Sequence, residues 1–169
     1  MNNYKKYLEE LIPAVDRERV WLFFLAFSRF ECALKNSGFA DGSADGVDPA
    51  WDRFASRHRH AFNPDSGVRL RAACDYFISH PPMKQVLNGS SLGWAGSHKL
   101  GTHPLLCWLV TMLRRVRNNL FHGGKFPMPI GPISDPVRDS LLIEHSLVIL
   151  CACLALDSGV QQKFQEPLA

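Results

Sequence analysis

Helix-spaced apolar residues dominate the chain and limit what it can fold into. In residues 16–37, apolar side chains recur every three or four positions, which is the spacing of one face of an α-helix. This stripe consists of Val20, Phe23, Phe24, Phe27, Phe30 and Leu34. The alternation with period two that would predict strands is nearly absent. We therefore expect an all-α fold, an antiparallel helical bundle with additional short helices and long Gly/Pro loops.

Cap residues set the expected ends of these helices. Asp16 is a good N-cap for the first helix, and Gly38 supplies its stop. A Gly/Asp/Ser linker follows over residues 40–47, and Asp48-Pro49 then resembles a helix start. Residues 88–102 are rich in Gly and Ser and predict a loop. The expected helices cover residues 16–37, 48–60, 66–80 with a turn continuing to 87, 102–122, and 135–157.

The size and charge of the chain indicate one globular domain with an unevenly charged surface. With 169 residues, 46% of them hydrophobic, the chain can bury one core. We expect a single domain over residues 1–169, with its core at about 16–157. The net charge of +3 is too small to indicate nucleic-acid binding by itself. Its distribution is more informative, because residues 76–134 contain no Asp or Glu. The cations in this window are Lys84, Lys99, Arg114, Arg115, Arg117 and Lys125. Such a window is typical of a site for a polyanion.

The cysteines and the apolar segments indicate a cytoplasmic protein that does not span a membrane. The five cysteines are odd in number and lie in helical patterns, which favours reduced, buried thiols. Cys151 and Cys153 point to different faces of a helix, so we expect no zinc site there and no other metal or cofactor. The N-terminus lacks the apolar region of a signal peptide. The apolar run 147–156 is too short for a membrane span.

A compact set of polar residues ends the helix at 102–122. Arg117-Asn118-Asn119-Leu120-Phe121-His122 is followed by two glycines. It combines a permanent cation, two amides and a side chain that titrates near neutrality, which suits chemistry on a phosphodiester. The alternative is a helix end at which Arg and His only complement the helix dipole.

One carboxylate lies where the first helix is expected to be buried. Glu31 falls in the centre of the apolar stripe, between Phe27 and Leu34. A buried carboxylate needs a partner, and we expect Glu31 to bind Arg117 across the bundle and fix its orientation. The alternative is a buried ion pair that only fixes helix register. Arg29 lies on the opposite face of the same helix, outside this pocket.

Two segments carry a family resemblance. Arg117 and His122, with four residues between them and Asn directly after the Arg, resemble the R-x(4-6)-H motif of the HEPN superfamily. Residues 28–35, Ser-Arg-Phe-Glu-Cys-Ala-Leu-Lys, are similar to the acidic first-helix segment of stand-alone HEPN proteins of plasmid and phage-conflict systems. The resemblance covers about residues 16–157. The chain departs from it in the extra helical material at 48–87 and in the long loop before the motif helix.

The resemblance implies an activity, an assembly and a partner. Catalytic HEPN proteins are metal-independent endoribonucleases whose dimers bring two motifs into one cleft. Carried over, Arg117, Asn118 and His122 become catalytic, with Glu31 beside them. The expected substrate-binding residues are Arg114, Lys125, Lys99 and Trp94, the last as a surface on which RNA bases stack. A toxin or phage-defence effector of this kind implies an antitoxin resembling a nucleotidyltransferase as candidate partner.

Two other classes of function remain open at this stage. A catalytically silent HEPN module could hold a nucleotide, RNA or protein in the same basic cleft. It would need cations but no titrating group, so the presence of both Arg117 and His122 favours the enzyme. A purely structural helical dimer would leave the acid-free window unexplained.

Overall fold

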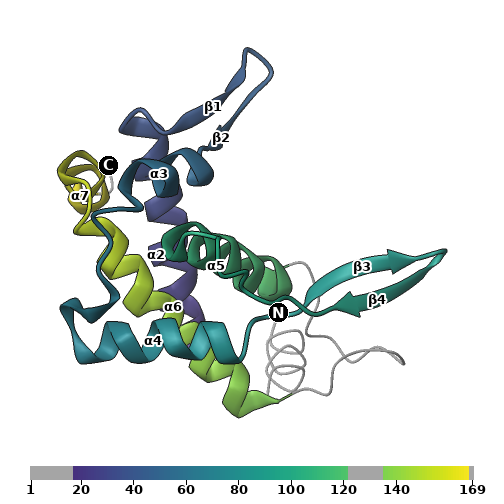
Figure 1. The fold of residues 1–169 in the computed structure, drawn as a ribbon. Helices are drawn as coiled ribbons and strands as arrows, with labels where there is room; N and C mark the ends of the chain where they lie inside the picture. The colour runs from purple at the N-terminus through teal and green to yellow at the C-terminus, as the bar shows by residue number, and fades with distance from the viewer. Residues whose placement is uncertain (1–16, 122–134, 168–169) are drawn as a thin grey trace, which may run out of the picture.

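A computed structural model of the chain describes residues 17–121 and 135–167, and helices make up most of this part. The helices are α2 (Arg17–Asn36), α3 (Trp51–His58), α4 (Val68–Ser79), α5 (Leu105–Phe121), α6 (Pro136–Leu154) and α7 (Ser158–Gln165), with a 3-10 turn, η1, at Pro64–Ser66. The strands are β1 (Ala40–Ser43), β2 (Gly46–Pro49), β3 (Lys84–Asn88) and β4 (Ser91–Ala95). Each strand pair is an antiparallel hairpin that extends from the helical body (Figure 1).

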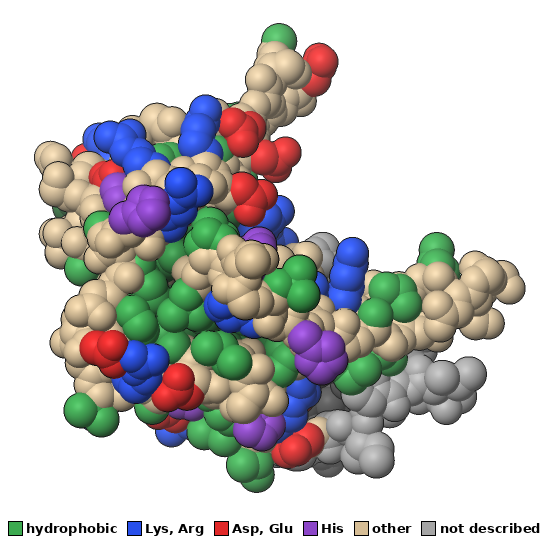
Figure 2. Space-filling view, in the orientation of Figure 1, with side chains coloured by type: hydrophobic (Ala, Val, Ile, Leu, Met, Phe, Trp, Pro, Cys, Tyr) green, Lys and Arg blue, Asp and Glu red, His purple; other side chains and the backbone are tan. Residues whose placement is uncertain are grey.

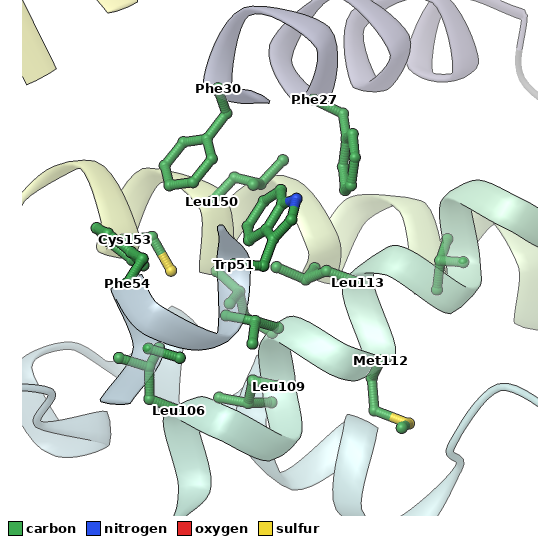
Figure 3. Packing of buried hydrophobic residues seen from close by; sticks show 14 of the residues in the cluster. Phe27, Phe30, Trp51, Phe54, Leu106, Leu109, Met112, Leu113, Leu150 and Cys153 are labelled. Atoms are coloured by element: carbon green, nitrogen blue, oxygen red, sulfur yellow. The ribbon is translucent and has the colours of Figure 1, made fainter. Parts of the chain in front are cut away.

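The core lies where the helices meet. Helix α6 packs against α4 and α2, α7 packs on α2, and α3 packs on α5. Trp51, the first residue of α3, is only 2% exposed. Its ring centroid lies 5.1 Å from that of Phe27 and 4.9 Å from that of Phe30, both on α2. Figure 3 shows this indole between α2 and α5, with its nitrogen directed toward α2. Trp51 therefore joins three helices at one point.

The expected all-α fold is wrong, because the chain also forms two β-hairpins. The first replaces the expected linker at 40–47 and the start of the expected helix at 48–60. In this hairpin Ala40 pairs with Pro49 and Ser43 with Gly46, and α3 begins only at Trp51. Most residues of the two strands are exposed. Their pairing is a backbone interaction that buries no apolar face, so it leaves no alternating pattern in the sequence.

The second hairpin replaces the expected helical turn to residue 87 and most of the expected loop at 88–102. Asn88 pairs with Ser91 across the two-residue loop Gly89-Ser90. Gly89 has φ +64°, whereas no non-glycine residue in the described ranges has positive φ. This is the pattern of a type II′ turn, which matches the twist of paired strands.

Helices α5 and α6 hold the base of this second hairpin. Arg115 Nη1 donates to the carbonyl of Pro82 at 3.1 Å, and Asn119 Nδ2 donates to the carbonyl of Met83 at 2.8 Å. From α6, Arg138 Nη2 donates to the carbonyl of residue 81 at 3.0 Å. These donors reach backbone groups more than thirty residues away in sequence, so local sequence rules could not predict the hairpin.

The expected last helix, 135–157, corresponds to α6, and an additional helix that was not expected, α7, follows it. The start of α6 is confirmed, since the Asp135 side chain accepts from the backbone N–H of Arg138 at 3.0 Å. Helix α6 ends at Leu154, and Asp157 then caps α7 by accepting from the N–H of Val160 at 3.0 Å. Arg29 donates to the carbonyls of residues 164 and 166 at the end of α7. Arg29 therefore lies away from Glu31's side of α2, as expected, and anchors α7.

The five cysteines all lie in described residues and carry free thiols. Cys74 and Cys153 are buried, and burial raises the pKa of the Cys153 thiol to about 12. Cys32 and Cys151 are exposed, so the expectation of buried thiols is wrong for these two. Within the described ranges no single helix is both long and apolar enough to cross a membrane. Only α6 and α7 taken together, with a bend of 118° between them, meet the length and composition.

Candidate functional site

The predicted contact between Glu31 and Arg117 is confirmed. Arg117 Nη2 donates to Glu31 Oε1 at 3.1 Å. The same oxygen accepts from Trp51 Nε1, also at 3.1 Å. The Arg117 guanidinium lies over the ring of Phe27, with its carbon 5.3 Å from the ring centroid. Glu31 is thus held by the core through Trp51, and Arg117 is held by Glu31 and Phe27.

The ion pair is half-buried and borders an open hollow. The Arg117 and Glu31 side chains are 30% and 22% exposed. They line a hollow of about 260 Å³ between α2 and α5, together with Phe24, Phe27, Ser28 and Phe121. Because the guanidinium carries five N–H donors and the bond to Glu31 uses Nη2, other donors are available for a second anion.

A second hollow adjoins the first and extends it along α2. It is lined by Arg17, Val20, Trp21, Phe24 and Phe121, and it shares the last two residues with the hollow at Arg117. We call the two hollows together the aromatic groove. Trp21 and Phe24 stack with centroids 5.8 Å apart and planes at 26°. Phe24 meets Phe121 edge to face at 5.2 Å. The groove therefore runs along a continuous set of rings to Arg117.

These rings are unusually accessible for aromatic side chains. Trp21 is 58% exposed, Phe121 41% and Phe24 40%. The expectation that Phe24 is part of the buried stripe is therefore wrong, and Trp21 is not in the core. The remaining stripe residues with ring or leucine side chains, Phe23, Phe27, Phe30 and Leu34, are buried as expected.

Two other predicted residues lie on the same helix as Arg117. Arg114 is three positions earlier, roughly 60° round α5. Its Nη1 lies 3.6 Å from Asp52 Oδ2, at the start of α3. Asn118, the predicted orienting amide, is exposed. Arg114 is therefore engaged by a carboxylate, whereas Asn118 is accessible to solvent.

Trp94 is separated from Arg117 by the body of α5, and Lys99 does not line the Arg117 hollow. Arg115 contacts the base of the β3–β4 hairpin, and it points roughly 160° away from Arg117 on a regular helix. Trp94 is half-buried on β4 and lines a small enclosed cavity with Asn119 and Leu142. Lys99 Nζ donates to the carbonyl of Leu100. The structure does not bring these two predicted binding residues to the Arg117 hollow.

His122 and Lys125, the remaining predicted site residues, lie outside the described residues. Among the described ones, no group of three or more His, Cys, Asp and Glu side chains could hold a metal ion.

Several residues at the site were not singled out by the sequence. Trp51 binds Glu31 although twenty residues separate them, and no periodicity links the two positions. Phe121 could have been found, because it is four residues after Arg117 and so on the same face of α5. Phe24 falls at the edge of the stripe, where helical spacing alone does not separate buried from exposed positions.

Carboxylates from other parts of the fold reduce the positive charge that residues 76–134, which contain no Asp or Glu, would otherwise present. Glu31 from α2 and Asp52 from α3 pair with two of the three arginines of α5, Arg117 and Arg114. Burial lowers the pKa of Arg115, the arginine at the hairpin base. Figure 2 shows acidic side chains on and beside the β1–β2 hairpin and none along the β3–β4 hairpin. Acidic side chains therefore gather at the β1–β2 hairpin, and two of the three arginines of α5 are paired with carboxylates.

No protein-family model, curated protein or solved structure matches this chain.

Proposed function

We propose that the protein is a metal-independent endoribonuclease of the HEPN type, with Arg117 and His122 as its catalytic pair. The proposal extends to a cytoplasmic toxin or defence effector, controlled by an antitoxin resembling a nucleotidyltransferase. The observation that carries it is the orientation of Arg117. Its guanidinium is held by Glu31 and Phe27 at the edge of an open hollow, five positions before the histidine of the motif.

The chemistry uses groups that RNA and these side chains supply. The 2′-OH of the substrate attacks the adjacent phosphorus, and the bond to the 5′ oxygen of the next nucleotide breaks. His122 transfers protons as general acid or base, and Arg117 stabilises the charge on the phosphorane oxygens. Asn118 orients the phosphate or His122. The products are a 2′,3′-cyclic phosphate and a 5′-hydroxyl.

Arg117 supports the proposal because its side chain is already held in place before a phosphate binds. A free arginine would lose side-chain entropy on binding a phosphate, whereas one already held by a carboxylate and a ring has lost it during folding. Glu31 also neutralises part of the positive charge of Arg117. The site is therefore suited to hold one phosphate in a defined position more than to attract polyanions in general. That balance suits a transition state whose charge is localised on one phosphate.

Cleavage of RNA in the presence of EDTA tests this function. Purified protein incubated with total RNA and EDTA should give fragments that end in a 2′,3′-cyclic phosphate, detected because their 3′ ends resist ligation until the phosphate is removed. A strict requirement for a divalent ion would contradict the mechanism. Base-dependent RNA binding without any cleavage would favour the silent binding module instead.

A homodimer is part of the proposal, because the HEPN resemblance implies one. Helix α2 exposes Leu22 and Leu25, apolar side chains of the kind that a second copy covers. Light scattering at micromolar concentration should give twice the mass of the chain. Replacing both leucines by aspartate should give a monomer of unchanged helical content, with Val68→Asp on α4 as a control at another exposed apolar position. A monomeric wild type would count against the dimer.

A further inference from the structure

We infer that the aromatic groove binds an unpaired RNA base beside the phosphate that Arg117 contacts; this inference rests on the proposed function and names how that site selects its substrate. The groove has two walls of different chemistry. Phe24 and Phe121 offer exposed ring surface, whereas Arg117 and Glu31 form a charged edge. A nucleotide has the matching halves, a planar apolar base and an anionic phosphate.

The size and lining of the groove suit one base. The hollow at Arg117 measures about 260 Å³, slightly below the range of pockets for drug-sized ligands. Ser28 places a hydroxyl on a wall that is otherwise aromatic and charged. Such a hydroxyl can donate to or accept from the edge of a base, while the rings contact its face.

The base must be unpaired to use these rings. In a duplex both faces of each base are stacked on neighbours, so an aromatic side chain can contact a face only in a loop, bulge or single strand. Stacking of a base on an aromatic ring is sequence-tolerant, because every base has a π-face. The groove therefore selects RNA by its local structure, next to the bond that is cleaved.

An RNA base explains the groove better than a second copy of the chain does. A protein interface over the groove would bury the Arg117–Glu31 pair, which costs desolvation energy without a new partner. The leucines proposed for the dimer lie on a different face of α2. Leu25 is roughly 100° from Phe24 round the helix, and Leu22 roughly 160°. A second copy can cover those leucines and leave the groove open.

Binding of an RNA that cannot be cleaved tests the inference separately from catalysis. A single-stranded oligonucleotide with 2′-fluoro groups lacks the attacking hydroxyl, so its dissociation constant reports binding alone. A series of these oligonucleotides carries one abasic position, moved along the strand. For the wild-type protein, one position should weaken binding by about tenfold when its base is removed.

Variants at the groove should abolish that dependence on the base. Phe24→Leu and Phe121→Leu keep an apolar side chain but remove the ring, and each should weaken binding of the intact oligonucleotide by about tenfold. In these variants the abasic position should cause little further loss, because the base has no ring to stack on. Phe24→Tyr should bind as the wild type does. Leu87→Ala, at an exposed position of β3, is the control and should also bind normally.

The possible results separate this inference from the proposed function. Normal binding by both leucine variants, or no binding of the oligonucleotide by the wild type, would overturn the inference whatever the cleavage assay shows. A shift in oligomeric state in Phe24→Leu would assign the groove to a second copy and would also overturn it. Base-dependent binding without cleavage of unmodified RNA would uphold the groove and end the proposal of a ribonuclease.

Discussion

Replacing His122 by alanine should abolish RNA cleavage and leave RNA affinity nearly unchanged. A neutral imidazole contributes little to the attraction of phosphates, which comes mainly from Lys and Arg. As the acid or base of the reaction, however, it raises the rate of cleavage by a factor of roughly 10² to 10⁴. Single-turnover cleavage and equilibrium binding of the same RNA measure the two effects separately. Wild-type cleavage should also depend on pH near the ordinary histidine pKa of about 6.5.

Arg117→Ala is the matched comparison and should impair both binding and cleavage. It removes a phosphate contact, and it leaves Glu31 half-buried, with the Trp51 indole as its one remaining donor among the described residues. Arg117→Lys keeps the charge but not the planar fork, so it should restore binding better than cleavage. Full cleavage by His122→Ala would refute the mechanism and favour the silent binding module.

Trp51→Ala should cause the largest loss of stability among single substitutions at the site. The indole is almost completely buried against Phe27 and Phe30 and carries one hydrogen bond to Glu31. Truncation of a buried aromatic side chain costs about 3–5 kcal/mol in free energy of unfolding. Urea unfolding followed by circular dichroism measures this change.

Two further variants separate the causes of that loss. Trp51→Phe keeps most of the ring contacts and removes the N–H donor, so it should cost about 1–2 kcal/mol. Trp21→Ala is the control on α2, because this tryptophan is largely exposed. It should change the free energy of unfolding by less than about 0.5 kcal/mol. A loss in Trp21→Ala as large as that in Trp51→Ala would mean that the exposed rings support the fold.

The helices were predictable because their signals are local. The stripe on α2, the stop at Gly38 and the cap at Asp135 each act within a few residues, and the structure has helices there. The Glu31–Arg117 contact was predictable for a different reason. A carboxylate in the middle of an apolar stripe must find a donor, and the charged end of α5 offered an arginine.

The hairpins and the additional helix α7 were not predicted from the same signals. The β1–β2 pair is exposed and short, so its strands do not require alternating apolar and polar residues. The β3–β4 pair is held at its base by Arg115 and Asn119, whose acceptors are backbone carbonyls more than thirty residues away. Asp157, whose carboxylate caps α7, also accepts a hydrogen bond from His58, which is 99 positions away.

The candidate site was also predictable in part from local sequence and in part only from tertiary contacts. Sequence alone determined which residues could do chemistry on a phosphodiester, because charge, titration near neutrality and helical spacing are properties of residue type and local order. Only the tertiary structure decided which of them meet. Helix α5 presents Arg117 to α2 and Arg115 to the β3–β4 hairpin, so Trp94 of that hairpin lies on the side away from the aromatic groove. The physical reason is that helical geometry fixes the relative directions of side chains on one helix, whereas burial of apolar side chains in the whole core determines which elements pack against that helix.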